Sequence, residues 1–267
     1  MARILAISSQ VARGAVGLSA IVPALQALGH DVIALPTVLL SNHPGHDHVS
    51  GTRIAPETLA GMLAALGRNG WLTGLDAVLT GYLPSVEHVA FAVEAITRVR
   101  AASPAALHLC DPVLGDAPKG LYIAEDAARA LRDTLVRDAD VVKLNRFEAS
   151  WIAGDACAVP KLGRMGCVVT SAAGAEREQL VNVACFGEAR LRCRVAERTS
   201  VPKGTGDLFS GLLLGYRLTG DEWGVALGRA VAAVDETLAA GDGDALAIVA
   251  AMPRYRTLAP FPVETAI

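Results

Sequence analysis

The sequence predicts an α/β protein with a mostly parallel central sheet flanked by helices. Three observations support this expectation. Short apolar runs alternate with longer amphipathic stretches, and strands separated by helices of ten or more residues indicate βαβ units. Hydrophobic residues make up 52% of the 267 residues and charged residues 19%, which leaves ample material for a core. Polar, glycine- and proline-rich segments follow most of the apolar runs. The length is ordinary for an α/β domain, so we expect 1–267 to form one domain.

In the first half of the chain, strands and helices alternate. Ile4–Ser8 has the composition of a buried strand, and Gly17–Leu28 is predicted as a helix that Gly29 ends. Ser85 is a suitable N-cap for a third helix. The remaining elements are strands at Asp31–Pro36, Asp76–Thr80 and Ala106–Cys110, and helices at Pro56–Leu66, Ser85–Val99 and Ala124–Val136.

The second half ends in helices. Val141–Leu144 and Gly166–Thr170 read as strands, and Val181–Phe186 with Ala189–Glu197 reads as a hairpin around Gly187 and Glu188. The tail, Pro253–Ile267, is expected to be irregular. The predicted helices are Asp207–Arg217, Glu222–Ala240 and Ala245–Ala251.

Composition excludes several classes of protein. The net charge of −3 gives no basic surface for nucleic acid and no polybasic membrane patch. No run of about 18 apolar residues predicts a membrane span. The segment Met1–Ile7 is too short for a secretory signal, and five cysteines without a CxxC pair suggest free thiols. We therefore expect a cytoplasmic protein.

The polar segments predict where a ligand binds. They are 8–14, 41–52, 111–120, 171–178 and 198–206. In open α/β sheets, ligands bind beyond the carboxyl ends of the strands, so these segments should gather at one edge.

The strongest local signal is Gly204-Thr205-Gly206-Asp207 before an apolar helix. Glycines let backbone N–H groups turn toward an anion, and a helix N-terminus adds partial positive charge. Asp207 could then accept a proton from a substrate hydroxyl. The alternative is a simple turn in which Asp207 or Thr205 caps the helix.

Two further segments carry carboxylates after predicted strands. Asp111 and Asp116 lie in Cys110-Asp-Pro-Val-Leu-Gly-Asp116. Asn145 ends a later strand, and Glu148 lies in the first turn of the helix that follows it. Oxygen ligands of this kind suit Mg²⁺ bound partly through water. The alternatives are turn chemistry around Asp111 and a helix cap formed by Asn145 with an acidic first turn.

Other motifs are weak or missing. His43, His46 and His48 lie close together, but their spacing matches no standard zinc site, so a polar loop is the preferred interpretation. His30, His88 and His108 read as structural or surface residues. No Walker A loop, GxGxxG or GxSxG is present.

Taken together, the segments resemble the pyridoxal kinase family of the ribokinase-like superfamily. The GTGD run alone indicates only the superfamily, whereas the Ser-Asn-His run and the Cys110–Asp116 segment are typical of the pyridoxal branch. The resembling segments follow the family order: Ile7–Val11 with Gly14–Gly17, Thr37–His43, Gly81–Leu83, Cys110–Asp116, Asn145–Glu148 and Gly204–Asp207.

The resemblance implies a three-layer α/β/α fold, commonly dimeric, that transfers a phosphoryl group from ATP to the 5′-hydroxymethyl group of pyridoxal. Asp207 would be the base, and Gly204, Thr205 and Gly206 would form the anion hole. Ser9, His43 and Tyr82 would face the pyridine ring, under a flap formed by 41–52. The implied Mg-ATP ligands are Asp111, Asp116, Glu148 and Asn145, with Thr170 and Ser171 near phosphate or a monovalent cation such as K⁺.

Three residues depart from the family pattern. Ala15 and Gln10 stand where histidine is usual, and Pro44 where threonine is common. They leave open the preference among pyridoxal, pyridoxine and pyridoxamine. A hydroxymethylpyrimidine kinase, a small sugar kinase and a non-catalytic vitamin-binding protein are the alternatives.

Overall fold

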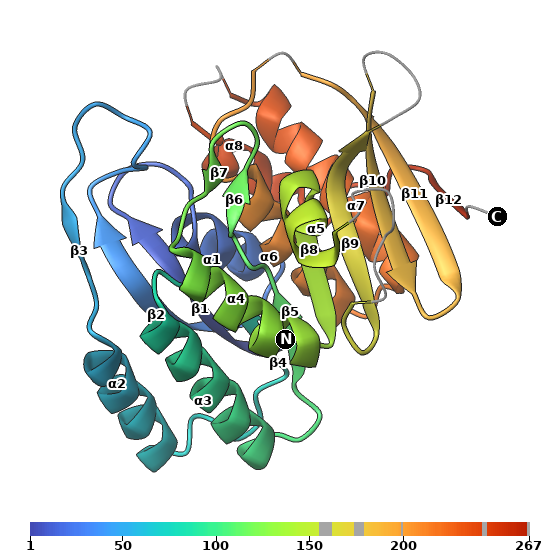
Figure 1. The fold of residues 1–267 in the computed structure, drawn as a ribbon. Helices are drawn as coiled ribbons and strands as arrows, with labels where there is room; N and C mark the ends of the chain where they lie inside the picture. The colour runs from blue at the N-terminus through green and yellow to red at the C-terminus, as the bar shows by residue number, and fades with distance from the viewer. Residues whose placement is uncertain (155–161, 174–178, 199, 242–244, 266–267) are drawn as a thin grey trace.

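A computed structural model describes residues 1–154, 162–173, 179–198, 200–241 and 245–265. Within these ranges, ten strands form one sheet in the order β12-β11-β10-β9-β8-β5-β4-β1-β2-β3 (Figure 1). The parallel part consists of β1 (Arg3–Val11), β2 (Asp31–Leu40), β4 (Ala77–Thr80), β5 (Leu107–Cys110), β8 (Val141–Asn145) and β9 (Gly166–Ala173). The antiparallel edges are β3 (Gly51–Arg53) on one side and β10 (Gln179–Phe186), β11 (Ala189–Ala196) and β12 (Val263–Thr265) on the other.

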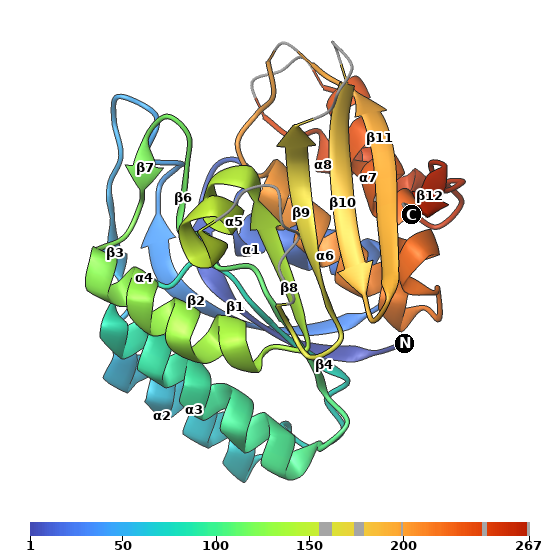
Figure 2. The same ribbon diagram turned by 45° about the vertical axis from the view of Figure 1, so that its right-hand side comes forward.

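Helices cover both faces of the sheet, which confirms the predicted three-layer α/β/α architecture (Figures 1 and 2). One face is packed by α1 (Leu18–Ala27), α6 (Thr205–Leu218) and α7 (Trp223–Ala239). The other is packed by α2 (Pro56–Arg68), α3 (Val86–Ala102) and α4 (Glu125–Leu131), which continues as the π-helical turn η1 (Arg132–Val136). The remaining short elements are α5 (Arg146–Ala153), α8 (Ile248–Ala251), the 3₁₀ turn η2 (Met252–Arg254) and the hairpin of β6 (Gly115–Asp116) and β7 (Gly120–Leu121).

Strand β1 shows why its sequence is apolar without interruption. Ile4 and Ala6 contribute to the core under α1, α6 and α7, whereas Leu5 and Ile7 contribute to the core under α2, α3 and α4. All four are fully buried. A parallel strand between two helical layers has no solvent face, so its hydrophobic pattern is continuous rather than alternating.

Three sequence-based expectations about the elements are wrong in detail. The tail is not wholly irregular, because Val263–Thr265 pairs with β11. The predicted helix Asp207–Arg217 begins two residues earlier than expected, because α6 starts at Thr205 with Gly204 as its N-cap. Ser85 occupies the N-cap of α3, but its hydroxyl bonds the side chains of Glu87 and His88 instead of the helix backbone.

The carboxyl ends of the parallel strands position the site. The loop after β1, the Gly81–Leu83 segment after β4, Asp111 after β5 and Asn145 at the end of β8 all lie at the same edge of the sheet. Segment 174–178, within a predicted loop, lies outside the described residues. Among the described residues, no helix is both long and apolar enough to cross a membrane.

The tail packs against the core through Tyr255, and this contact generates a stability prediction. Its side chain is fully buried, its hydroxyl contacts Thr237 Oγ1 at 2.7 Å, and its carbonyl accepts a hydrogen bond from Tyr216 at 2.6 Å. We expect Tyr255→Ala to lower the free energy of unfolding in urea by about 3–5 kcal/mol. The control Val249→Ala, at a 77% exposed residue, should change it by less than about 0.5 kcal/mol. Equal effects would show that the tail does not contribute to the core.

Candidate active site

The Gly204–Asp207 segment begins helix α6 against the loop that follows β1. Gly204 has φ +98°, and a Cβ atom at this position would clash with the carbonyl oxygen of Ala15. Glycine is therefore required both by the backbone conformation and by the close approach. The first N–H groups of α6 have no partners within the helix, so they face outward as an anion site of the predicted kind.

Asp207 lies in the first turn of α6 and is not its cap. No side-chain cap hydrogen bond is formed at this helix end, and the Asp207 carboxylate instead accepts a hydrogen bond from the backbone N–H of Gly17. The capping alternative for Asp207 and Thr205 is therefore wrong. The Asp207 carboxylate therefore lies at the N-terminus of α6 and forms no capping hydrogen bond within that helix.

Burial raises the pKa of Asp207 to about 6, and the charge of Asp111 adds to this effect. The Gly17 hydrogen bond and the ammonium of Lys143 act in the opposite direction. The side chain keeps some exposure, yet the dense protein around it still disfavours its charge. Asp207 is nevertheless ionised at neutral pH and near the ideal pKa for a proton acceptor.

Asp111 lies at the centre of a buried polar cluster. Its Oδ2 atom accepts hydrogen bonds from Lys143 Nζ at 3.0 Å and from Ser210 Oγ at 2.6 Å. Its Oδ1 atom is buried and has no hydrogen-bond partner among the described residues. Sequence reasoning missed Lys143 and Ser210 as site residues. The signal was present for Lys143, because a charged residue inside the apolar strand Val141–Leu144 needs a buried partner.

Asn145 and Glu148 form a capping box at the start of α5, as the capping alternative predicted. Asn145 Oδ1 accepts from the Glu148 N–H at 2.9 Å, and Glu148 Oε2 accepts from the Asn145 N–H at 2.8 Å. The same two side chains hold the loop after β5. Glu148 Oε1 accepts from the Leu114 N–H at 2.9 Å, and Asn145 Nδ2 donates to the Gly115 carbonyl at 2.8 Å. Burial and the charge of Asp111 raise the pKa of Glu148.

The predicted Mg²⁺ ligands do not converge into a cage of their own. Among the described residues, no three His, Cys, Asp or Glu side chains lie close enough to hold a metal ion. Glu148 is engaged by backbone N–H groups, and Asp116 lies in the β6–β7 hairpin. The orphaned Oδ1 of Asp111 is an oxygen that suits a hydrated Mg²⁺ carried by a polyphosphate, because this ion keeps several waters and needs only one or two carboxylates.

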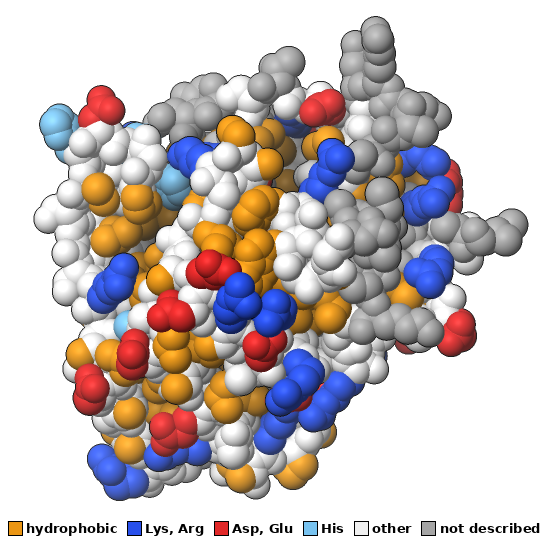
Figure 3. Space-filling view, viewed as in Figure 1, with side chains coloured by type: hydrophobic (Ala, Val, Ile, Leu, Met, Phe, Trp, Pro, Cys, Tyr) orange, Lys and Arg blue, Asp and Glu red, His pale blue; other side chains and the backbone are white. Residues whose placement is uncertain are grey.

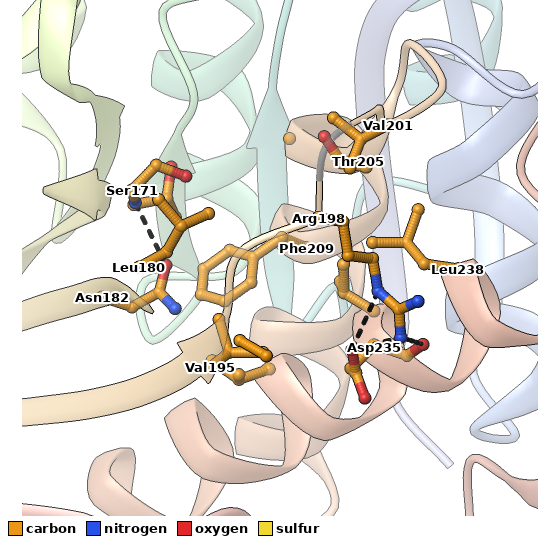
Figure 4. Close-up of a pocket in the computed structure, with 15 residues that line it drawn as sticks. Ser171, Leu180, Asn182, Val195, Arg198, Val201, Thr205, Phe209, Asp235 and Leu238 are labelled. Carbon is orange, nitrogen blue, oxygen red and sulfur yellow. Dashed lines mark hydrogen bonds and ion pairs between the residues drawn. The ribbon is translucent and has the colours of Figure 1, made fainter. Parts of the chain in front are cut away.

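A small cavity of about 130 Å³ opens between β9, β10, β11 and the start of α6. Thr170 and Ser171 line it, together with Thr205 and Gly206, so the structure brings these four predicted residues together. Figure 4 shows Phe209 at its centre and the ion pair of Arg198 with Asp235 on one side. Thr170 donates to the Leu144 carbonyl at 3.2 Å, and Ser171 is held by Asn182, whose Oδ1 accepts its N–H at 3.3 Å.

A larger cavity of about 910 Å³ lies on the other side of the loop 201–204. His43 and other residues of the segment 41–52 line it, opposite Lys119 and Lys203. Burial, with the charges of Lys203 and Lys119, lowers the pKa of His43, so its imidazole is neutral at pH 7. The tip of this segment carries exposed histidine and acidic side chains at the upper left of Figure 3.

Ser9 and Tyr82 are not among the residues that line this cavity. Gly17 packs directly against Ser9, and its N–H binds Asp207, so Ser9 is connected to Asp207 through one residue. The Tyr82 N–H donates to Ser8 Oγ at 3.1 Å, and its carbonyl accepts from Thr37 Oγ1 at 2.8 Å.

The remaining histidines and cysteines are structural. Each of the scattered histidines has a hydrogen-bond partner in the core: His30 with Gly215, His88 with Ile54 and His108 with Thr80. Four cysteines are buried free thiols, as predicted, and Cys157 lies outside the described residues. His43, His46 and His48 form no metal group with other described residues.

Comparison with known proteins places this geometry in a family. No family model matches the chain. Pyridoxal kinase PdxY of Pseudomonas putida strain W619 is 33% identical over 250 residues, which cover 88% of this chain and 86% of that protein. Pyridoxal kinase PdxY of Rubrobacter xylanophilus is 42% identical over 151 residues, 57% of this chain. The chain spans about half the length of that relative and of two similar ones.

A solved structure extends the comparison to three dimensions. Pyridoxal kinase from Leishmania donovani, in complex with ADP and pyridoxamine, superposes with a TM-score of 0.91 at 26% identity, and the match covers 99% of both chains. This likeness confirms the ribokinase-like fold expected from the sequence. The similarity to the Pseudomonas putida protein over most of both sequences, on the same fold, shows that this chain belongs to the pyridoxal kinase family.

Proposed function

We propose that the protein transfers the terminal phosphoryl group of ATP to the 5′-hydroxymethyl group of pyridoxal. The observation that carries this proposal is the position of the segment 201–207 between two cavities. Thr205 and Gly206 line the small cavity, while Pro202 and Lys203 line the large one. A donor nucleotide on one side and an acceptor alcohol on the other would meet at the first turn of α6, beside the Asp207 carboxylate.

The chemistry asked of the protein is positioning and charge stabilisation. Asp207, ionised at neutral pH, accepts the proton of the substrate hydroxyl as its oxygen attacks the terminal phosphorus. The N–H groups after Gly204 hold the oxygens of the transferring group, with the helix dipole adding partial positive charge. Thr170 and Ser171 hold the nucleotide phosphates or an accompanying K⁺. His43 and the flap 41–52 exclude water from the acceptor. The proposed contacts of Ser9 and Tyr82 with the pyridine ring lie outside the lining of this cavity.

Mg²⁺ would arrive with ATP and neutralise the polyphosphate when bound. Asp111 is its best protein ligand, because Oδ1 is an orphaned oxygen at this edge of the sheet. Asp116 and Glu148 would contribute through water. Asn145 and Glu148 keep the loop after β5 in place through the capping box, which preserves the position of Asp111.

The alternatives differ in substrate or in the presence of catalysis. A hydroxymethylpyrimidine kinase, a sugar kinase and a vitamin-binding protein could all use this fold. Asp207 is ionised and does not cap the helix. This favours an enzyme over a binding protein, because a binding protein needs no proton acceptor. A coupled assay of ADP release with pyridoxal, pyridoxine, hydroxymethylpyrimidine and ribose separates these candidates. We further propose that the protein is cytoplasmic and that it forms a homodimer. Sedimentation of the purified protein would test the homodimer.

Asp207→Asn separates the base from a structural carboxylate. We expect kcat to fall by at least about a hundredfold, because asparagine cannot accept the proton. Binding of ATP and pyridoxal, measured by calorimetry, should persist.

The same variant has a stability signature with a definite sign. The folded pKa of Asp207, about 6, lies above that of an unfolded aspartate, so its stabilising contribution is present at low pH and lost as pH rises through 6. Asp207→Asn should therefore raise the melting temperature at pH 8 more than at pH 5. A variant that keeps most of its turnover would contradict the assigned base.

The pH profile of the native protein follows from the same carboxylate. We expect kcat/KM for pyridoxal to fall about tenfold per pH unit below about pH 6, as Asp207 becomes protonated, and to level off above it. Steady-state rates between pH 4.5 and 8, after confirming that the fold survives, measure this limb. A flat profile down to pH 5 would exclude Asp207 as the titrating base.

The flap prediction concerns His43. Its ring lines the large cavity, and its Nδ1 accepts the Gly45 N–H at 2.9 Å, which shapes the flap. His43→Ala removes both features, so we expect the KM for pyridoxal to rise about tenfold or more while the KM for ATP stays within about twofold. Val49→Ala, at an exposed residue of the same segment that does not line the cavity, is the matched control. Equal changes in both KM values would place His43 outside the acceptor site.

A further inference from the structure

Lys143 is a buried cation at the active site to which the phosphoryl-transfer mechanism has so far given no role. It lies in β8, and only 5% of its side chain is exposed. Lysine is almost never buried to this degree unless it is paired. Its partner is Asp111, whose side chain is 3% exposed.

This pair leaves hydrogen-bonding capacity unused on both sides. An ammonium has three N–H donors, and among the described residues Lys143 forms one hydrogen bond, to Asp111 Oδ2 at 3.0 Å. Asp111 Oδ1 is also without a partner in the described part of the chain. Buried polar groups left unpaired are costly, so a structural ion pair alone does not account for this arrangement. A ligand with anionic oxygens would satisfy the ammonium.

The ammonium lies against the loop that would hold the phosphoryl group. A Cβ atom on Gly206 would come within 2.8 Å of Lys143 Nζ. The absence of a side chain at Gly206 therefore lets this nitrogen lie directly against the loop. Gly206 also lines the small cavity together with Thr170 and Ser171. Lys143 Nζ thus lies beside the wall of the cavity in which the donor phosphates would sit.

The charges of the cluster require a cation at this point. Asp111, Glu148 and Asp207 surround Lys143 with carboxylates, and its ammonium forms an ion pair with Asp111 at 3.0 Å. A polyphosphate entering this site brings further negative charge toward three carboxylates, and an ammonium held in place reduces that repulsion without any reorganisation.

We propose, on the basis of the proposed function, that Lys143 is a catalytic residue that donates a hydrogen bond to a non-bridging oxygen of the phosphoryl group during transfer. In this step the bond between the terminal phosphorus and the β,γ-bridging oxygen breaks, and ADP leaves with the electron pair. The bond between phosphorus and the substrate oxygen forms, and the hydroxyl proton passes to Asp207. Lys143 makes and breaks no covalent bond, and Asp111 positions its ammonium.

The test compares two variants that differ only in this ammonium. Lys143→Met alone would leave Asp111 as a buried unpaired charge, which destabilises a fold strongly. In Asp111→Asn, by contrast, Lys143 still has the charges of Glu148 and Asp207 nearby. The comparison is therefore between Asp111→Asn and the double variant Asp111→Asn with Lys143→Met. The double variant replaces the ion pair by neutral groups of similar volume, a change that proteins usually tolerate. Melting temperatures of both variants verify that they fold.

In kinetics, the double variant should lose about 10²–10³ in kcat relative to Asp111→Asn, the range found for one lost oxyanion donor. The KM for pyridoxal should stay within about threefold, because Lys143 lies on the donor side of the loop. If Lys143 serves only as the structural partner of Asp111, adding Lys143→Met to Asp111→Asn changes kcat by less than about threefold, and the proposal is overturned.

A binding measurement gives a second readout that needs no acceptor substrate. ADP with aluminium fluoride and Mg²⁺ mimics the transferring phosphoryl group, and its affinity can be compared by calorimetry with that of ADP and Mg²⁺. The double variant should lose the extra affinity for the mimic by about a hundredfold while its affinity for ADP changes less than about threefold. Equal losses for both ligands would contradict a contact with the transferring group.

The two readouts separate this proposal from the proposed substrate. If the native protein binds the mimic tightly, the double variant does not, and pyridoxal is not phosphorylated, then the role of Lys143 stands and the acceptor assignment fails. If the native protein phosphorylates pyridoxal and the two variants behave alike in both measurements, the kinase assignment stands and the role of Lys143 fails.

Discussion

The contact between Gly204 and the Ala15 carbonyl holds the active site together. It presses the first turn of α6 against the loop after β1, and only a glycine permits this approach. The same loop then supplies the Gly17 N–H that binds Asp207. Segments nearly two hundred residues apart in the chain are thereby fixed relative to each other. A side chain at position 204 would displace the helix N-terminus and the carboxylate together.

The buried carboxylates show a balance between stability and chemistry. Burial raises the pKa values of Asp207 and Glu148, so the folded protein disfavours charges that the proposed chemistry uses. A fold selected for stability alone would place neutral groups here. Two kinds of interaction reduce the free-energy cost of burying these charges. Backbone N–H groups from Leu114, Asn145 and Gly17 bind these carboxylates, and Lys143 provides an opposite charge.

Much of the fold could be predicted from the sequence because the helices and buried strands have strong periodicity. The errors concern features that depend on tertiary partners. Val263–Thr265 forms a strand only because β11 offers an unpaired edge, and no local sequence pattern predicts this pairing. The first turn of α6 was placed two residues late because the conformation of Gly204 depends on Ala15. Capping by Asn145 and Glu148 was predictable, since the Asn-x-x-Glu spacing is itself a capping box.

The electrostatics of the site were harder to predict than its residues. The sequence identifies Asp111 and Asp207 as candidate residues but does not give the pKa of Asp207, because burial depends on what packs around a side chain. It shows Lys143 as a charged residue in an apolar strand, but it does not show that Asp111 is its buried partner. Asp111, Lys143 and Ser210 come from these three elements and bond within 3.0 Å.

The capping box also shows how one motif serves two purposes. Asn145 and Glu148 end strand β8, start helix α5 and clamp the loop that carries Asp111. Their hydrogen bonds are largely structural, yet the position of Asp111, the proposed Mg²⁺ ligand, depends on them. A carboxylate at this point can therefore matter for phosphoryl transfer without contacting the nucleotide, because it fixes the backbone on which the reacting groups stand.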